Sequence, residues 1–417
     1  LQGFCNVLGD NLINVHIFNC CTCFYDGAPH NIGQTNIFNL PNYDIIDMLI
    51  IAPFYLSSSE EVIRYTIERA VEKNVPVLTI GKQYDYPNCY CIMPDYRRQI
   101  ELITNHLIER HGIRKLNFLG GYKNHFTSDE RLEGFLDALK SHNIPIEPSR
   151  IYYGNLWSAP AIQQVEKMNE DGNLDCGAIV CANDTMASAV MIKLSELGFD
   201  MPGEIAVTGM DGTDEANGYI TTAKILADKA GEEAANIVAN LLLRGKKPAK
   251  LGITPPNIIY GISCRCTNMQ NALDLLPKQR HDLFEELYDA RRFSIRTAAI
   301  AQELANCSTF DDASRSISAT LSRIWCSNSC ICICKDFMES SLVNDSIDDI
   351  EDNCPVHRHG YCDTMKCIAR YADKKPQSET EFPTSEMLPD FYEMSDKSKV
   401  ILYTPIHIRD NTLGYLA

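Results

Sequence analysis

Long apolar runs and positive charge are both scarce in this sequence of 417 residues. No apolar run reaches about 18 residues, the length that a membrane-spanning helix needs, so no membrane segment is expected. The sequence has 38 Lys and Arg residues and 55 Asp and Glu residues, which gives a net charge of −17. Proteins that bind nucleic acids neutralise phosphates with positive charge, so this chain is not expected to contact DNA by itself.

Common catalytic signatures are missing as well. The sequence has no Gly-x4-Gly-Lys phosphate loop, no His-Glu-x2-His motif and no Gly-x-Ser-x-Gly elbow after a strand. The pair Gly120-Gly121 lacks the third glycine of a dinucleotide fingerprint and is interpreted as a turn. We therefore predict no catalytic residue, no cofactor and no enzyme activity in the visible chain.

The 18 cysteines are scattered and often stand beside apolar residues. A secreted disulfide scaffold would be short and rich in loops, so reduced thiols in a cytoplasmic protein are expected. Cys330, Cys332 and Cys334 alternate with isoleucines, which predicts a strand with the three thiols on one face.

One segment has ligand types that suit zinc, in the order Cys354-x2-His357-x-His359-x2-Cys362-x4-Cys367. Its spacing matches no common closed zinc site. An ordinary thiol-rich loop is the favoured interpretation, and no metal ligand is predicted.

The first 260 or so residues alternate short apolar runs with amphipathic helical periods, which is typical of α/β folds with parallel sheets. The strand-like runs are 15–18, 48–52, 77–80, 116–119, 178–181 and 205–208. Their number fits two Rossmann-like lobes better than one sheet. Residues 1–268 are predicted to form this part.

The pattern changes after residue 268. Residues 269–306 repeat apolar positions at helical spacing among charges and predict a helical linker, with Leu283, Leu287 and Leu304 facing a second copy if the chain is a homodimer. Residues 307–417 predict helices followed by antiparallel strands, an α+β domain that includes a hairpin at 399–416 and is cut off at Ala417.

Polar residues follow two of the buried strands. Asn183-Asp184 comes after the run ending at Cys181, and Asp211 ends the next run. Parallel strands bring their carboxyl ends to one edge of a sheet, where open α/β folds bind ligands. A cap on the following helix, by Asn183 or Asp184, is the alternative role and is compatible with ligand contact.

Together these motifs resemble the effector-binding domain of the lactose-repressor (LacI/GalR) family, which is similar to periplasmic sugar-binding proteins. The resemblance rests on 178–187, Pro202 to Asp211, Arg131 to Phe135, Asp95 before a helix and Thr221-Thr222, in order and at matching spacing. It covers residues 1 to about 266. The first strand of such a domain and any helix-turn-helix head are missing, so the sequence is expected to begin inside a larger protein.

The resemblance implies a periplasmic-binding-protein-like fold of type I and a small hydroxyl-rich effector, such as a sugar or nucleoside, in a cleft between two lobes. It implies that Arg131, Asn183 and Asp211 contact effector hydroxyls. Trp157 falls where a cleft residue is expected and would stack on the effector, with core packing as the alternative. Asp95 is followed by Tyr-Arg-Arg in place of the family's small residues.

Residues 307–417 also resemble the GAF-like segment of regulators that join such a sensor to a diguanylate-cyclase or helix-turn-helix output. No Gly-Gly-Asp-Glu-Phe motif is present. The main hypothesis is thus a cytoplasmic, homodimeric sensor that relays effector binding to an output domain, and that contacts DNA only through a head outside this sequence. The alternatives are the sensor part of a diguanylate cyclase whose catalytic domain follows residue 417, and, more weakly, an extracytoplasmic solute-binding protein.

Overall fold

The computed structural model describes residues 2–8, 13–20, 28–52, 60–213, 216, 218–224, 227–246, 257–266, 269–321, 328–340, 360–372, 375–390 and 399–417. The contacts between residues divide the chain into two compact units. Unit 1 contains residues 1–93, 231–251 and 290–417, and unit 2 contains residues 94–230 and 252–289. Within the described residues, no helix has the length and apolar character that crossing a lipid bilayer requires.

Unit 2 is built on a six-stranded sheet in the order β10-β9-β8-β7-β5-β6. The strands are β5 (Leu116–Gly120), β6 (Ile151–Tyr153), β7 (Ala178–Cys181), β8 (Ala206–Asp211), β9 (Thr221–Lys224) and β10 (Asn257–Ile259). Five strands run parallel, and β10 pairs antiparallel with β9. This arrangement confirms the predicted α/β architecture for this part of the chain.

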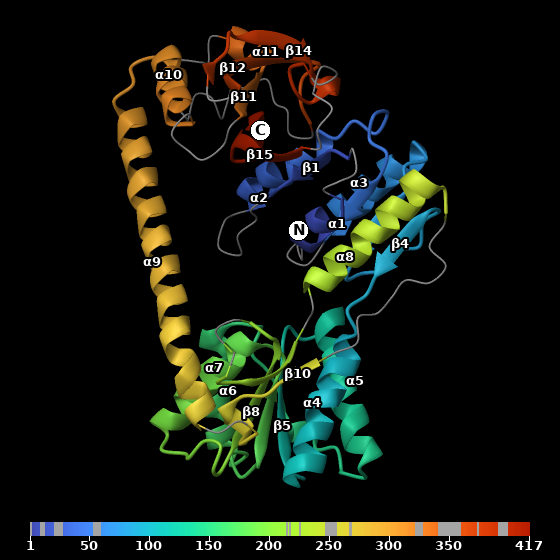
Figure 1. Cartoon of the computed structure of the whole chain (residues 1–417), viewed down its shortest axis with the longest axis vertical. Coiled ribbons are helices and arrows are strands. Elements are labelled where there is room, and N and C mark those ends of the chain that lie inside the picture. Colours follow the sequence, from blue (N-terminus) through green and yellow to red (C-terminus); the bar gives the residue numbers. More distant parts are fainter. Residues whose placement is uncertain are drawn as a thin grey trace. The chain divides into compact units, whose positions relative to one another are not determined.

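Helices cover both faces of this sheet, as Figure 1 shows. The helices are α4 (Tyr96–His111), α5 (Phe126–Ser141), α6 (Ser158–Glu170) and α7 (Asp184–Glu196). Alternate strand residues face opposite layers: Phe118 and Val180 pack with α4 and α5, whereas Leu119 and Ile179 pack with α6 and α7. Strands buried on both faces explain the continuous apolar runs of the sequence.

The contact between α4 and α5 is unusually close at Gly134. A β-carbon on this residue would lie 2.1 Å from the main-chain oxygen of Arg97 on α4. Only glycine allows the two helices this approach.

Unit 1 contains a small parallel sheet in the order β2-β3-β4, with β2 at Leu49–Ile51, β3 at Val77–Ile80 and β4 at Cys89–Ile92. Helix α3 (Glu60–Glu72) packs on it through Ile63 and Ile67. Helices α1 (Gln2–Leu8) and α8 (Ala227–Val238) share a second core with Leu78 and Ile92. This second parallel sheet agrees with the prediction of a second α/β lobe.

The larger sheet of unit 1 contains the C-terminal strands in the order β1-β15-β16-β11-β12-β13, with β14 also paired to β12. Its strands are β1 (Val15–Phe18), β11 (Ser329–Cys334), β12 (Thr364–Ala372), β13 (Lys375–Pro376), β14 (Thr380–Pro383), β15 (Val400–Ile408) and β16 (Asn411–Leu416). Every pairing but that of β1 is antiparallel, and β15 and β16 form the expected hairpin. Helices α10 (Phe310–Leu321) and α11 (Lys335–Glu339) complete an α+β domain.

Strand β1 departs from the sequence prediction. Its run was expected in the parallel sheet of an α/β lobe, but it pairs parallel with β15, from Val15 opposite Val400 to Phe18 opposite Tyr403. The Phe18 and Tyr403 rings stack with centroids 4.7 Å apart. Without β1, β15 would be an edge strand with unpaired main-chain groups, so the N-terminal segment covers this edge.

The helix predicted for residues 269–306 is present as one continuous helix, α9 (Met269–Ala305), of 37 residues. At 1.5 Å per residue it is about 55 Å long. Leu283, Phe284 and Leu287 are 53%, 64% and 62% exposed, an unusual condition for large apolar side chains on one helix.

Candidate functional site

The carboxyl edge of the unit 2 sheet brings several predicted site residues together. Strand β7 ends at Cys181, and Asn183 follows it; its parallel neighbour β8 ends at Asp211. Helix α5, which covers the sheet, carries Arg131. The residues come from separate strand–helix units, as the sequence interpretation expected.

Asn183 is the N-cap of α7. Its side-chain Oδ1 accepts a hydrogen bond from the Met186 amide at 2.9 Å, and its Nδ2 donates to the Leu156 carbonyl at 3.0 Å. The capping role therefore belongs to Asn183, not Asp184, and the same side chain links the β6–α6 loop to the β7–α7 turn. Among the described residues, one amide hydrogen and one oxygen lone pair of Asn183 have no partner.

Asp184 is buried beside the cap and holds the loop after β8. Its Oδ2 accepts a hydrogen bond from the Thr213 amide at 2.9 Å, and burial raises the pKa of its carboxyl. A β-carbon at Gly209 would lie 2.2 Å from its Oδ1, so β8 needs glycine where this carboxyl passes. Asp184 thus braces the end of the strand that carries Asp211.

Arg131 is only 6% exposed, which is rare for arginine. Its guanidinium carbon lies 4.6 Å from the centre of the Tyr96 ring, and its Nε donates to the Met210 sulfur at 3.3 Å. Within the described residues, its two terminal nitrogens have no hydrogen-bond acceptor. Most of the donor capacity of a buried cation is therefore left for another partner.

Asp211 has two features that are typical of functional residues. Its backbone φ of 112° lies in a region that side chains other than glycine rarely adopt. Burial raises the pKa of its carboxyl to about 7, while nearby Arg131 lowers this pKa and Asp184 raises it. In the described part of the chain, the carboxyl makes no hydrogen bond, and its charge is opposed mainly by Arg131.

Trp157 is 54% exposed, which excludes the core-packing alternative. It stands at the N-terminus of α6, on the loop after β6, and its Nε1 donates to the Tyr122 hydroxyl at 3.2 Å. Tyr122 follows β5, so two loops at the carboxyl edge are joined here. The exposed indole face can stack on a ring placed against this edge.

Comparison with known proteins identifies the region that carries these residues. Residues 104–264 match the periplasmic binding protein-like domain family. Over these residues the chain is similar to periplasmic binding protein-like domains and to curated transcriptional repressors. This finding confirms the first part of the predicted resemblance, and it includes Arg131, Trp157, Asn183 and Asp211.

Two curated relatives are transcriptional repressors by name. The HTH-type repressor PurR of Actinobacillus pleuropneumoniae serotype 3 is 31% identical over 140 residues, which are 33% of this chain and 41% of that protein. The probable HTH-type repressor ExuR of Bacillus subtilis is 25% identical over 214 residues, 51% of this chain and 63% of that protein. The chain thus spans about half the length of these relatives. Both names agree with the expectation that this region is not an enzyme.

A solved structure extends the likeness of fold. A transcription regulator from Lactobacillus plantarum aligns with a TM-score of 0.51 and 17% identity, over 63% of this chain and 93% of that chain. At this identity the alignment supports the fold alone.

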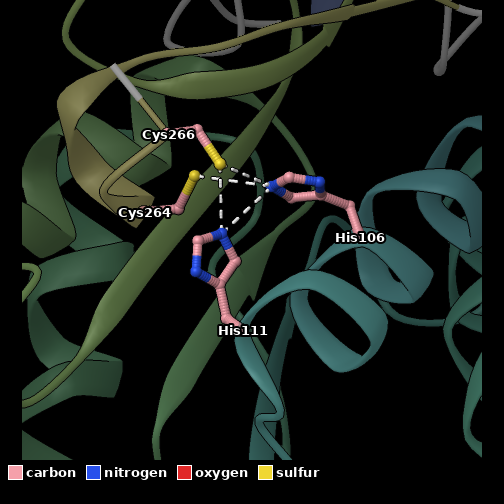
Figure 2. Close-up of side chains that lie close together, drawn as sticks. All are labelled: His106, His111, Cys264 and Cys266. Atoms are coloured by element: carbon pink, nitrogen blue, oxygen red, sulfur yellow. Dashed lines mark hydrogen bonds between the residues drawn. The ribbon is translucent and has the colours of Figure 1, made fainter. Parts of the chain in front are cut away.

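A second group of side chains in unit 2 was not predicted. His106 and His111 stand on the last turns of α4, and Cys264 and Cys266 stand on the short 3-10 turn Ile262–Cys264 and just after it. Figure 2 shows the two sulfur atoms and two imidazole nitrogens turned toward one another. One donor atom from each residue lies within 4.8 Å of all the others.

The contacts in this second group are short. The Nε2 atom of His106 lies 3.3 Å from Nε2 of His111, 3.6 Å from Sγ of Cys264 and 3.2 Å from Sγ of Cys266, and Nε2 of His111 lies 3.1 Å from Sγ of Cys266. Burial, together with the smaller effects of nearby His111 and Arg110, lowers the pKa of His106 to about 4. The sequence did not predict this group, because neither His106-x4-His111 nor Cys264-x-Cys266 is a spacing that by itself indicates a metal site.

None of the fourteen cysteines that the structure describes is in a disulfide bond. Cys330 and Cys332 lie on β11 with their sulfur atoms 3.8 Å apart and Cys367 beside them, as expected for one face. Cys334 instead groups with Asp336 and Cys362.

The histidine- and cysteine-rich segment singled out in the sequence lies partly outside the described residues, at Cys354, His357 and His359. Its described members, Cys362 and Cys367, belong to two different groups.

Proposed function

We propose that this chain is a ligand-sensing regulator that binds a small hydroxyl-rich effector, of the sugar or nucleoside class, at the carboxyl edge of the unit 2 sheet. The observation that carries the proposal is the pair formed by Arg131 and Asp211. Arg131 is buried and Asp211 is partly buried, their side chains are oppositely charged, and within the described residues their hydrogen-bonding capacity is largely unused. Because an unsatisfied buried polar group costs about 1–3 kcal/mol, a ligand with hydroxyls would be bound by filling both.

The other two predicted residues complete the proposed site. Asn183 would offer its remaining amide hydrogen to the effector while capping α7 with its oxygen. Trp157 would cover one face of the effector ring. A polyol at this site would contact a guanidinium donor, a carboxylate acceptor, an amide and an aromatic face. These are the groups that bind sugars in proteins.

We further propose that effector binding closes the two lobes and that α9 passes this change onward in a homodimer. A single helix of this length moves as one element, so a displacement of its N-terminal end is transmitted to its C-terminal end. The exposed side chains of Leu283, Phe284 and Leu287 support pairing with the α9 helix of a second copy, which would remove them from water. Residues 1–268, 269–306 and 307–417 would be the sensor, the linker and a GAF-like relay domain of a cytoplasmic protein.

The output of the relay is proposed to be transcriptional control through a DNA-binding head outside this sequence. The repressor names of the curated relatives support this choice. The alternative output, a diguanylate cyclase domain after residue 417, has no comparable support. The chain supplied with GTP and magnesium should therefore make no cyclic dinucleotide.

The effector is tested by a thermal-shift screen of sugars and nucleosides against the whole chain. A compound that binds only the folded state raises the unfolding midpoint. Asp211→Ala should weaken binding of the compound found by about 1–3 kcal/mol, because the loss removes one charged hydrogen-bond partner. Asp129→Ala, an exposed carboxylate on the same helix as Arg131, is the matched control and should bind as the native chain does. Equal binding by both variants would remove Asp211 from the site.

The dimer is tested by light scattering at micromolar concentration. The native chain should have twice the mass of one chain, and Leu283→Asp with Leu287→Asp should shift it to one chain, because charges cannot be buried in the paired face. Ile192→Asp, which changes an exposed apolar residue on α7, should leave the mass unchanged. A native chain that is monomeric at this concentration would exclude the paired-helix relay.

A further inference from the structure

We propose that His106, His111, Cys264 and Cys266 form a structural zinc site that fastens the root of α9 to the end of α4. The proposal does not depend on the effector or on the proposed output, because it rests on a different group of residues in unit 2.

The first argument is the number of contacts that converge on one atom. Nε2 of His106 lies within 3.2–3.6 Å of three other donor atoms, one nitrogen and two sulfurs. An imidazole nitrogen has either one lone pair or one hydrogen, directed in the plane of its ring, so it can serve one hydrogen bond well and not three. Hydrogen bonding among the four side chains therefore does not account for the arrangement.

The second argument is the match to the dimensions of a tetrahedral zinc site. Zinc binds nitrogen at about 2.0–2.1 Å and sulfur at about 2.3 Å, so neighbouring ligand atoms on the tetrahedron lie about 3.3 Å apart for two nitrogens and about 3.5 Å for nitrogen and sulfur. The two His nitrogens lie 3.3 Å apart, and three nitrogen–sulfur distances measure 3.1, 3.2 and 3.6 Å. Four of the six donor–donor distances are thus close to those of a tetrahedral zinc site, and the other two pairs of donor atoms lie within 4.8 Å.

The third argument is chemical. Two thiolates and two neutral imidazoles are a common donor set of structural zinc sites, and two thiolate charges balance the 2+ charge of the ion. Cys264 is 1% exposed and the other three residues are partly buried, so a neutral centre is favoured over an exposed ionic one. The Thr221 hydroxyl lies 2.8 Å from the Cys264 sulfur, and it can donate to a thiolate as residues around metal ligands usually do.

The position of the group gives the proposed site a role. Cys266 stands three residues before Met269, where α9 begins, whereas His106 and His111 belong to the helix that packs against β8 and β9. The ion would join these two segments, which are more than 150 residues apart in sequence. The start of the long helix would then be held by the periplasmic-binding-protein-like domain and not by main-chain connection alone.

The test begins with the zinc content of the whole chain, purified after expression with added zinc and measured by plasma mass spectrometry. Cys264→Ser with Cys266→Ser, and separately His106→Gln with His111→Gln, should each lose about one zinc per chain relative to the native protein. Cys176→Ala and His142→Gln change the same residue types elsewhere in unit 2 and should keep the native content. Comparing variants isolates this site from any metal held by the cysteines of β11. Equal zinc content in all five proteins would overturn the proposal.

A second measurement covers the case in which a variant does not fold. Cobalt added to the native chain after its zinc has been removed with a chelator should give the visible bands and thiolate charge-transfer absorption of a tetrahedral site with two sulfur ligands. A strong zinc chelator should also lower the unfolding midpoint of the native chain and increase hydrogen exchange of peptides covering 257–266. Absence of the cobalt bands from the native chain, or no change in midpoint and exchange with the chelator, would overturn the site even if every variant aggregated.

Discussion

Unit 2 carries two groups of polar side chains that differ in how the chain assembles them. At the carboxyl edge, Asn183 and Asp211 each stand directly after a buried strand, so the topology of a parallel sheet brings them together. In the histidine–cysteine group, α4 supplies two residues and a turn more than 150 residues later supplies the others. The first group follows from a fold pattern, whereas the second depends on one particular packing of α4 against the segment after β10.

The two groups also differ in what they leave unfilled. Arg131 has unused hydrogen-bond donors and Asp211 has unused acceptors, which suits a ligand with several hydroxyls. The four donors of the other group are directed at one point, which suits a single ion. The geometry of the unused donors therefore indicates the kind of ligand.

The largest effect in this comparison is expected from Asp211→Asn. The pKa of Asp211 is raised to about 7 in the folded chain and is about 3.9 in an unfolded one, so the folded state holds a proton that the unfolded state releases between these values. The free energy of unfolding of the native chain should therefore fall as pH rises from about 4 to about 7, by up to about 4 kcal/mol.

The asparagine variant removes this titration. It should match the native chain near pH 4 and exceed it in stability near pH 8, as measured by urea unfolding at both values. Asp129→Asn, which changes an exposed carboxylate, should retain the native pH dependence. If Asp211→Asn kept the pH dependence of the native chain, the Asp211 carboxyl would not be the group whose pKa is raised by burial.

A smaller effect, about 3 kcal/mol, is expected from Gly134→Val. The added side chain meets the Arg97 carbonyl and forces α4 and α5 apart. Since α5 carries Arg131 and α4 carries His106 and His111, this one change should weaken both effector binding and zinc retention, measured on the same preparation. If only effector binding or only zinc retention changed, the two groups of residues would not both depend on the packing of α4 against α5.

The smallest effect is expected from the matched change Gly112→Ala. Gly112 ends α4 with a φ of +66°, and a β-carbon there meets nothing within 4 Å. Only the left-handed backbone is penalised, by about 1 kcal/mol, so stability should fall slightly while both binding properties remain native. Loss of zinc in this variant would mean that the positions of the four proposed zinc ligands depend on the last turn of α4 and not on the contact of α4 with α5.

The sequence was sufficient where structure follows from local pattern. The apolar runs that became β5, β7 and β8, the stripe that became α4 with Gly112 at its end, and the continuous helix α9 depend on side-chain period and on residues next to one another in the chain. The carboxyl-edge residues were found for the same reason, because a residue after a buried parallel strand has only one edge to occupy. The side-chain roles were harder to assign: the cap belongs to Asn183, and Trp157 is exposed.

Only the tertiary structure decided the features that join distant segments. The pattern of Val15–Phe18 predicts a strand, but its partner β15 is almost 400 residues away, and which open edge it covers depends on the whole of unit 1. His106, His111, Cys264 and Cys266 carry no joint signal, because a ligand set is defined by distances in space and the sequence constrains distances only over a few residues. The sequence by itself thus determined the elements and the edge where an effector would bind, whereas packing alone brought the four proposed zinc ligands to one point.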